Sequence, residues 1–203
     1  SMRKTDDIVR VDPWSYMDYC MKEFDGFQGR SMDQDPLLIC RTNQARVEMN
    51  AAVRIGLGTD KKLVEGERVI ALKNAYLEGA MVANGFRGTV NEIKHARNVN
   101  HLCADVHFPD EGLVLDDALM NVHQFGRSVT FKTLDEIPGN PPAMDLVGLL
   151  FDYGYALTCH KAQGSQAEKV IVKVDRGKMD DNEWKRWLYT SVTRATKKLA
   201  LIY

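Results

Sequence analysis

The hydrophobic and polar positions of the chain follow two different patterns, one typical of alternating strands and helices and the other of short β-strands. Residues 37–40 form a short continuous apolar run that ends in polar residues, and apolar positions then recur at helical spacing up to Gly56. The pattern therefore predicts a strand, a polar turn and a helix over residues 37–56.

From about Leu63 the pattern changes to short β-like segments separated by Gly, Asn, Asp and Pro. The predicted segments are residues 68–72, 88–90, 104–108 and 128–131. This texture predicts an all-β insert, and a small barrel is the architecture that suits it. A proline-rich linker at residues 138–142 closes the insert, which we place at residues 63–144.

The α/β texture returns after the insert. Strands are predicted at residues 153–157, 170–174 and 199–203, and a long helix precedes the last of them. The helix has one apolar stripe at helical spacing, formed by Trp184, Trp187, Leu188, Ser191, Val192 and Ala195. Residues 36–62 and 145–203 together are predicted to form one α/β domain. Residues 1–35 are predicted to be a connecting segment with a weak helix at 13–27.

Composition excludes several classes of protein. The 203 residues are 44% hydrophobic and 27% charged, which is ordinary for a globular chain. The net charge of −1 means that any DNA contact must come from a local surface. The four cysteines are too far apart for a zinc site or a dense disulfide framework, so we expect reduced thiols and no metal. No apolar run reaches the ~18 residues of a membrane span, and we expect a cytoplasmic protein.

Two polar segments stand out from the core-like sequence. Residues 157–166 read Leu-Thr-Cys-His-Lys-Ala-Gln-Gly-Ser-Gln, and residues 189–195 read Tyr-Thr-Ser-Val-Thr-Arg-Ala. The first concentrates hydroxyl, imidazole, ammonium and amide groups at the carboxyl end of a predicted strand, where α/β folds bind phosphates. Taken singly, Arg194 is more typical of an ordinary surface arginine, and His160 is more typical of a structural histidine.

Together, these segments resemble motifs V and VI of superfamily 1 helicases, in the right order and spacing. Residues 37–50 are similar to motif IV. Lys73-Asn74 and residues 84–88 resemble a signature of the inserted SH3-like barrel of RecD-like and phage Dda-type DNA helicases, which also have a UvrD-like C-terminal domain. The resemblance implies a RecA-like α/β domain, related to P-loop NTPases, that is interrupted by an SH3-like β-barrel.

The resemblance also implies roles for single residues. Arg194 would be the arginine finger that stabilises charge on the γ-phosphate of ATP. The motif V residues implied to lie at the nucleotide are Gln163, Gly164, Ser165 and Gln166, and those implied to hold single-stranded DNA are Thr158, His160 and Lys161. Gln163 would couple the two groups.

Three positions are weaker within the resemblance. The family usually has Glu where this chain has Gln166, which removes a charge but keeps a group that can hydrogen-bond a ribose hydroxyl. In motif IV, Arg41 would contact ATP and Asn43 would contact DNA. A structural role at the end of a strand explains those two residues equally well.

A phosphate-binding Gly-x-x-x-x-Gly-Lys-Ser/Thr loop does not occur in these residues. We therefore expect the C-terminal part of an ATP-dependent DNA helicase whose N-terminal RecA-like domain supplies that loop and holds Mg²⁺. Ser1-Met2 resembles a cleavage scar, which fits a fragment that is inactive alone. Its partner would be single-stranded DNA or a duplex junction in a bacterial or phage-infected cell. The alternative is a stand-alone DNA-binding or protein-docking adaptor with a degenerate helicase fold.

Overall fold

The computed structural model describes residues 8–12, 15–24, 32–59, 62–77, 80–98, 100–131 and 148–203. The chain divides into two compact units. One unit comprises Ser1–Asp60 and Tyr155–Tyr203, and the other comprises Lys61–Gly154. The second unit thus extends ten residues beyond the end predicted for the insert at residue 144, because residues 151–153 pair within its sheet.

The first unit is built on a five-stranded sheet in the order β1-β12-β11-β2-β10. Its strands are β1 (Ile8–Val11), β2 (Leu37–Cys40), β10 (Ala156–Thr158), β11 (Ala167–Lys173) and β12 (Ala195–Ile202). All neighbouring strands pair in parallel. β2 lies between β11 and β10 and is buried along its whole length, as its continuous apolar run indicates.

Strand β1 lies within residues 1–35, which the sequence assigns to a connecting segment. It pairs with β12 from Ile8 opposite Leu199 to Val11 opposite Ile202. Three of its four residues are exposed. Ile8, Val9 and Val11 are β-branched, but the run has only four residues and its partner β12 lies at the other end of the chain, so the sequence does not reveal this edge of the sheet.

Three α-helices belong to this unit: α1 (Tyr16–Phe24), α2 (Asn43–Gly56) and α3 (Asp181–Val192). A short 3₁₀ helix, η2 (Met32–Gln34), precedes β2. Both ends of the helix expected over residues 13–27 lie outside the described residues. α3 ends at Val192, so Ala195 belongs to β12 and not to the helical stripe. Trp187 and Ser191 are the buried members of that stripe.

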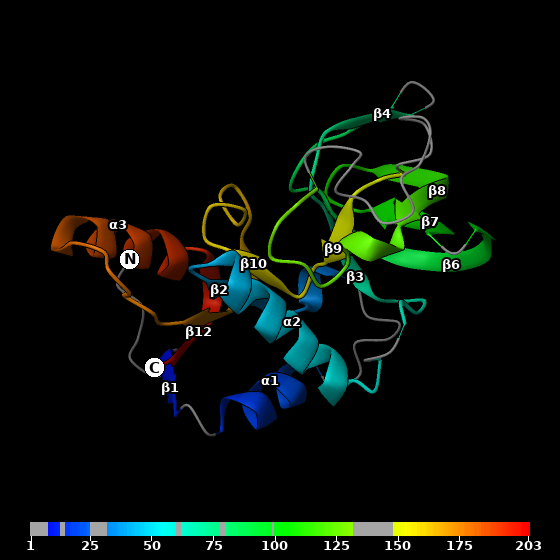
Figure 1. The fold of residues 1–203 in the computed structure, drawn as a ribbon. Helices are drawn as coiled ribbons and strands as arrows, with labels where there is room; N and C mark the ends of the chain where they lie inside the picture. Colours follow the sequence, from blue (N-terminus) through cyan, green and yellow to red (C-terminus); the bar gives the residue numbers. More distant parts are fainter. Residues whose placement is uncertain are drawn as a thin grey trace. The chain divides into compact units, whose positions relative to one another are not determined.

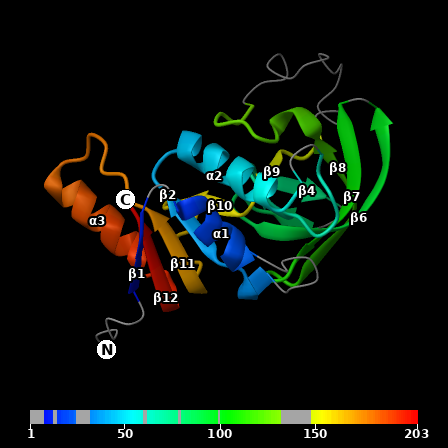
Figure 2. The ribbon, with the colours of Figure 1, turned by 90° about the horizontal axis from the view of Figure 1, so that it is seen from below.

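The strand order determines which face of the sheet each connection covers. Connections between parallel strands are right-handed, so opposite directions of travel across the sheet lead to opposite faces. The chain travels one way from β1 to β2 and the other way from β11 to β12. Accordingly, α1 and α2 pack together on one face and α3 lies on the other (Figure 1 and Figure 2). The connection from β10 to β11 travels in the same direction as that from β11 to β12, and so runs on the face of α3.

A side chain supports the free side of the edge strand β10. Asn50 of α2 accepts a hydrogen bond from the backbone N–H of Ala156 (2.8 Å) and donates one to the carbonyl of the same residue (3.3 Å). Just before this strand, the ring of Tyr155 meets that of Phe24 edge to face, with centroids 5.5 Å apart. Asn50 thus satisfies the two backbone groups of β10 that a further strand would otherwise pair.

The second unit is an antiparallel sheet in the order β8-β7-β6-β3-β9, with a separate two-stranded sheet of β4 and β5. The strands are β3 (Arg68–Ala71), β4 (Ala75–Leu77), β5 (Ala80–Val82), β6 (Arg87–Asn98), β7 (His101–Phe108), β8 (Leu113–Asn121) and β9 (Phe151–Tyr153). A 3₁₀ helix, η3 (Val122–Gln124), follows β8. The core gathers side chains from β3, β6, β7, β8 and β9.

The two edges of this antiparallel sheet are joined through the residues before β9. The N–H of Leu149 donates to the carbonyl of Leu119 in β8 (2.6 Å), and the N–H of Asn121 donates to the carbonyl of Leu149 (3.0 Å). Leu149 also forms an isolated parallel bridge with Met120. The strand at one edge is therefore bonded to the segment that leads into the strand at the other.

Two strand predictions are wrong. Residues 128–131 are not a strand, because the amide of Gln124 accepts from the N–H of Phe131 (2.9 Å) and donates to the carbonyl of Val129 (3.3 Å). The strand predicted at 153–157 is two strands in different sheets, β9 and β10, separated at Gly154 and Tyr155. At Gly154 a Cβ atom would lie 2.8 Å from the backbone of Val69, so only glycine fits there. The predicted linker at 138–142 lies outside the described residues.

Replacing Asn50 by Ala is expected to lower the free energy of unfolding by about 2 to 4 kcal/mol, because Ala156 would keep a buried N–H and a buried carbonyl without partners. Urea unfolding followed by circular dichroism measures this. Asn43→Ala is the matched control, since Asn43 is exposed and its replacement should change stability by less than about 0.5 kcal/mol. Equal unfolding midpoints for the two variants would contradict the role assigned to Asn50.

Candidate functional site

The connection from β10 to β11 carries the predicted motif V residues. It begins with the N–H of Cys159 bonded to the carbonyl of Cys40 (3.0 Å), which continues the pairing of β10 with β2. It then turns tightly, with the N–H of Ala162 on the carbonyl of Thr158 (3.0 Å) and that of Ser165 on the carbonyl of Ala162 (3.2 Å). Gly164 has a φ of +88°, a conformation that glycine adopts without strain. The turn is therefore closed by its own backbone.

A pocket of about 470 Å³ lies between this connection and α3. It is lined by Cys159, His160, Gln163, Met179, Glu183, Arg186, Trp187 and Thr190. Three of these residues belong to the predicted motif V, namely the buried Cys159 and the pair His160 and Gln163. Both have exposed side chains, so they lie at the rim of the pocket.

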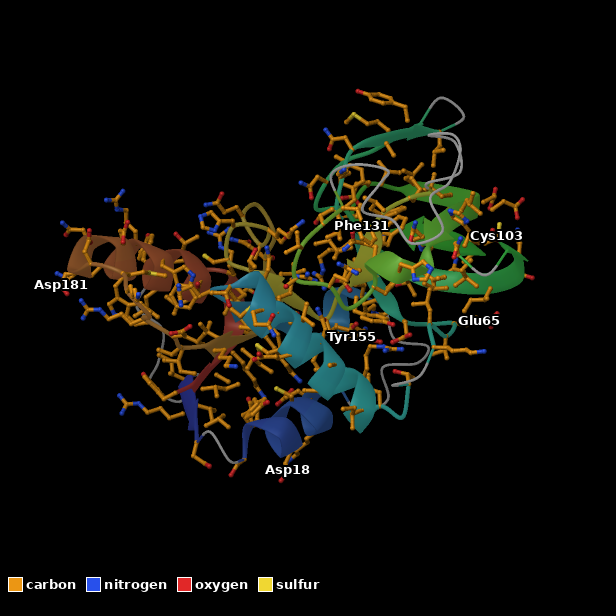
Figure 3. The ribbon with its side chains drawn as sticks, viewed as in Figure 1. Asp18, Glu65, Cys103, Phe131, Tyr155 and Asp181 are labelled. Carbon is orange, nitrogen blue, oxygen red and sulfur yellow. The ribbon has the colours of Figure 1, made fainter. Side chains whose placement is uncertain are left out.

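Helix α3, which forms the other wall, is fixed at its first turn. The carboxylate of Asp180 accepts from the backbone N–H groups of Asn182 and Glu183, both at 2.8 Å, and the carboxylate of Glu183 accepts from the N–H of Asp180 at 3.3 Å. This reciprocal capping box satisfies N–H groups that the helix cannot pair internally. Figure 3 labels the next residue, Asp181, at this end of the helix.

The pKa of Asp180 is lowered, chiefly by the hydrogen bond from the backbone N–H of Glu183 and then by that from Asn182. Buried Cys40, at the end of β2, shows the opposite effect, because burial raises the pKa of its thiol to about 12. Cys40 is therefore a neutral core residue at physiological pH and not a nucleophile.

The middle of α3 is held against the motif V connection. The Cys159 thiol donates to the carbonyl of Trp187 (3.8 Å), and the Ser191 hydroxyl donates to the same carbonyl (2.9 Å). Trp184 and Trp187 stack with ring centroids 5.3 Å apart and planes inclined by 14°. The helix therefore presents a rigid aromatic surface to the pocket.

Arg194 lies in the turn between α3 and β12, and not on the flank of the helix as its spacing predicts. Its Nε donates to the carbonyl of Thr190 (3.1 Å), Nη1 to the carbonyl of Ser165 (3.4 Å) and Nη2 to the hydroxyl of Thr193 (3.3 Å). These three acceptors are all neutral oxygens. Arg194 and the end of the predicted motif V are thus in direct contact.

The two predicted motif IV residues occupy the carboxyl end of β2. Arg41 forms an ion pair with Asp175, with Nη2 3.1 Å and Nε 3.2 Å from one carboxylate oxygen. Gly177 packs under this guanidinium, where a Cβ would come within 2.4 Å of it. Asn43 is the exposed first residue of α2, after the N-cap Thr42.

The predicted residues therefore separate into two groups, one at the carboxyl ends of the strands and the other at their amino ends. Thr158, His160, Arg41 and Asn43 lie at or just beyond the carboxyl ends of β10 and β2, with Lys161 next in the turn. Ser165, Gln166 and Arg194 precede the amino ends of β11 and β12. By the register of β11 with β12 and with β2, Arg41 lies about eight residues further along the strand direction than Arg194. This corresponds to a separation of roughly 25 Å along the strands. The structure does not bring Arg41 together with the other residues assigned to the nucleotide.

Exposure differs among the remaining predicted residues. Gln166 is exposed, and Lys161 is half-buried. Thr158 is only 7% exposed, as the last residue of β10. Contact between Thr158 and a DNA strand would therefore involve a small part of its surface.

Within the described part of the chain, no group of three or more His, Cys, Asp or Glu side chains is arranged to hold a metal ion. Across the same residues, no helix has the length and apolar content needed to cross a membrane.

The segment that contains the motif V connection, α3 and Arg194 matches a known protein family. Residues 153–202 match the UvrD-like helicase C-terminal domain. This match and the fold confirm the resemblance to superfamily 1 helicases. The family match covers the C-terminal quarter of the chain, which includes both predicted motifs V and VI.

Solved structures extend the likeness over most of the chain. A Pif1 helicase from Bacteroides, in complex with ADP-AlF3 and ssDNA, superposes with a TM-score of 0.51 at 16% identity, covering 89% of this chain and 44% of that one. Another structure, of Bacteroides Pif1 bound to ssDNA, has a TM-score of 0.48 at 19% identity and covers 93% and 45%. The first of these likenesses, at 16% identity, shows the fold alone, a parallel α/β sheet of the RecA-like kind.

Among curated proteins, uncharacterized protein MJ1519 of Methanocaldococcus jannaschii is 43% identical over 51 residues. That alignment covers 25% of this chain and 4% of that protein. The chain spans less than half the length of the Pif1 helicases and a small part of this relative.

Sequence reasoning did not find the pocket residues contributed by α3 and the loop before it. Met179, Glu183 and Arg186 line the pocket with the motif V residues and with Thr190, which the sequence already assigns to motif VI. Trp187 was identified only as a member of a core stripe. The available signal was the combination of two tryptophans at i and i+3 with charged residues on the same helix, which suits a surface that is part core and part binding site.

The capping box makes the stability of α3 depend on pH. Because the pKa of Asp180 is lower in the folded state than in the unfolded chain, its contribution is present above the unfolded pKa and is lost as pH falls through the folded value. Asp180→Asn keeps a capping oxygen but cannot titrate. We expect the urea midpoints of the parent and this variant to converge as pH falls from about 4, near the unfolded pKa of Asp, through the lowered folded pKa. A constant difference between them over that range would contradict this role.

Proposed function

We propose that the chain is the C-terminal part of an ATP-dependent DNA helicase or translocase. The observation that carries this proposal is the contact between Arg194 and Ser165 within a segment that matches a helicase C-terminal domain. Among the described residues the arginine is held beside the motif V residues by neutral acceptors, so its charge remains available to an incoming anion. The similar structure of a Bacteroides Pif1 helicase contains ADP-AlF3 and ssDNA.

In this proposal Arg194 is the arginine finger. Arginine fingers stabilise the charge that develops on the phosphoryl group as the bond to the leaving phosphate breaks. The nucleotide residues beside it are Gly164, Ser165 and Gln166, with Gln163 between them and the pocket. Arg41 is assigned to ATP by the resemblance alone, because it is paired with Asp175 at the other edge of the sheet.

DNA binding is assigned to the residues at the carboxyl ends of β10 and β2. His160 is exposed there and Lys161 follows it, so an imidazole and an ammonium can contact phosphates while the Thr158 hydroxyl and the Asn43 amide lie nearby. The two proposed sites are then joined by the motif V connection and α3. Closure of the protein around ATP would move both together.

The rest of the ATP site is proposed to come from an N-terminal RecA-like domain. That domain would carry the phosphate-binding loop and hold Mg²⁺, so the 203 residues alone should not hydrolyse ATP. Lys61–Gly154 is proposed to be the SH3-like barrel, since the bonds of Leu149 to β8 connect the edges of its sheet. We expect the protein to act in the cytoplasm on single-stranded DNA or a duplex junction.

Lys161→Ala should weaken binding of this chain to single-stranded DNA. Loss of one phosphate contact reduces the slope of log affinity against log salt by about 0.7 for a single strand. Fluorescence anisotropy of a labelled oligonucleotide at several salt concentrations measures both affinity and slope. Lys198→Ala, an exposed cation on β12, is the control and should change neither. If neither the parent chain nor either variant bound the oligonucleotide, DNA binding by this chain would be excluded.

Arg194→Ala, placed in a protein that also carries the N-terminal domain, should reduce DNA-stimulated ATP hydrolysis by about 1000-fold or more. Binding of single-stranded DNA should be nearly unchanged, because Arg194 lies at the other edge of the sheet from His160. Steady-state phosphate release with and without DNA measures the effect. Lys198→Ala again serves as the control. Retention of hydrolysis in Arg194→Ala would disprove the arginine-finger assignment.

A further inference from the structure

The guanidinium of Arg41 is fixed along one of its sides. Arg41 directly follows β2, and its Nε and Nη2 both donate to the same carboxylate oxygen of Asp175, at 3.2 and 3.1 Å. A guanidinium has five N–H donors in one plane, and this side-on pair uses two of them. The three that remain are both N–H groups of Nη1 and the outer N–H of Nη2. Two of these form the parallel fork at the end of the side chain.

The end fork of Arg41 is open to an anion. In the described part of the chain, the guanidinium bonds to Asp175 alone, and the Arg41 side chain is 28% exposed. The two parallel N–H groups at the end of a guanidinium match two oxygens of one phosphate. Because Asp175 occupies the side of the guanidinium, a phosphate can bind the end without displacing it.

The loop after β11 holds the same guanidinium from a second direction. Gly177 has a φ of +53°, and a Cβ atom there would lie 2.6 Å from Cζ of Arg41, so the glycine backbone packs closely under the charged group. The loop itself is held by Arg176, whose Nε donates to the carbonyl of Met179 (3.3 Å) and whose guanidinium pairs with Asp181. A fork that is already fixed loses less side-chain entropy when it binds an anion.

The strand register places this fork beside the residues proposed to bind DNA. Cys40 in β2 lies opposite Thr158 in β10. Arg41 and His160 therefore follow the carboxyl ends of neighbouring strands, whose backbones are roughly 5 Å apart. Helix α2 also begins here, at Asn43, and the amino end of a helix favours anions. A DNA strand that runs across these ends from β10 towards β11 meets His160 first and Arg41 second.

The same register separates Arg41 from the proposed arginine finger. Arg194 lies about eight residues back along the strand direction, which is roughly 25 Å. A single nucleotide bound at Arg194 cannot reach across that distance to Arg41. The anion that the end fork takes must therefore be a different one.

We propose that Arg41 binds a phosphate of the single-stranded DNA through its end fork, and that Asp175 and Gly177 are the positioning residues that aim it. The inference rests on the proposed function, because it adds a contact to the strand held by His160 and Lys161. It replaces the assignment of Arg41 to ATP, which the resemblance alone supports.

The test uses the 203-residue chain and fluorescence anisotropy of a labelled single-stranded oligonucleotide at several salt concentrations. Arg41→Ala should weaken binding roughly five- to tenfold and reduce the slope of log affinity against log salt by about 0.7, because one phosphate contact is lost. Arg41→Lys keeps the charge without the planar fork, so it should keep the parent slope and still bind more weakly. Lys198→Ala, an exposed cation on β12, is the control and should change neither.

Gly177→Ala tests the positioning with Arg41 left in place. The added Cβ would push the guanidinium aside, so DNA affinity should fall to about the level of Arg41→Lys. Gly58→Ala is the matched control, because Gly58 also has a positive φ, of +72°, but a Cβ there meets no atom within 4 Å. Both variants place alanine in a left-handed conformation, and only the first should weaken DNA binding.

The outcomes separate this inference from the proposed function. Unchanged affinity and slope in Arg41→Ala, with affinity that still falls in Lys161→Ala, would overturn the role of Arg41 and leave the proposed function standing. Equal DNA affinities of the two glycine variants would overturn the positioning. If Arg41→Ala does not fold, Arg41→Lys and Gly177→Ala provide the same decision. Absence of binding by the parent chain would overturn both this inference and the proposed function.

Discussion

Parallel pairing of the five strands in the first unit determines where every residue of the candidate site can lie. A parallel strand must be reached by a connection that runs back over one face of the sheet. Each connection therefore carries the chain from the carboxyl ends of the strands to their amino ends. The motif V connection makes this crossing between β10 and β11, beside α3. One short stretch of sequence can therefore serve two distant places, with His160 at one edge and Ser165 at the other.

Helix α3 joins the same two edges by a second route. Its first turn is fixed by Asp180, its middle is bonded to Cys159 of the neighbouring connection, and its last turn holds Arg194 through Thr190. Two rigid segments thus run side by side across one face of the sheet. The pocket lies between them, so anything that changes its width acts on both.

The sequence predicted the features that depend on local pattern and on whole motifs. The buried run of β2, the helix after it, the α/β character of the C-terminal segment and the two polar motifs were all recognisable. Features that depend on tertiary contacts were not. β1 is exposed over most of its length and is a strand only because β12 pairs with it. Residues 128–131 read as a strand because nothing in their own sequence shows that Gln124 bonds their backbone.

The candidate site likewise divides into residues that the motifs predict and features that only the tertiary contacts reveal. Arg194 and Ser165 were identified together from their motifs, and the structure joins them. Arg41 was grouped with them, but strand register places it at the opposite edge, which no spacing within a motif can reveal. The buried indole N–H of Trp187, which has no acceptor among the described residues, was also hidden, because a helical stripe predicts burial and does not predict whether a buried N–H finds an acceptor.

The bond between Asn50 and Ala156 spans 106 residues of sequence, and the second unit occupies most of that interval. β2 and α2 are complete early in the chain, yet the strand that leads into motif V joins them only after the intervening unit has been made. Closing so long a loop costs entropy before any contact compensates for it, which slows folding. During synthesis β2 therefore waits with both of its sides unpaired, because its partners β10 and β11 both follow the inserted unit. Pairing of β3 with β9 within the inserted unit brings Ala71 opposite Phe151, which shortens the open loop between β2 and β10 and with it that exposure to aggregation.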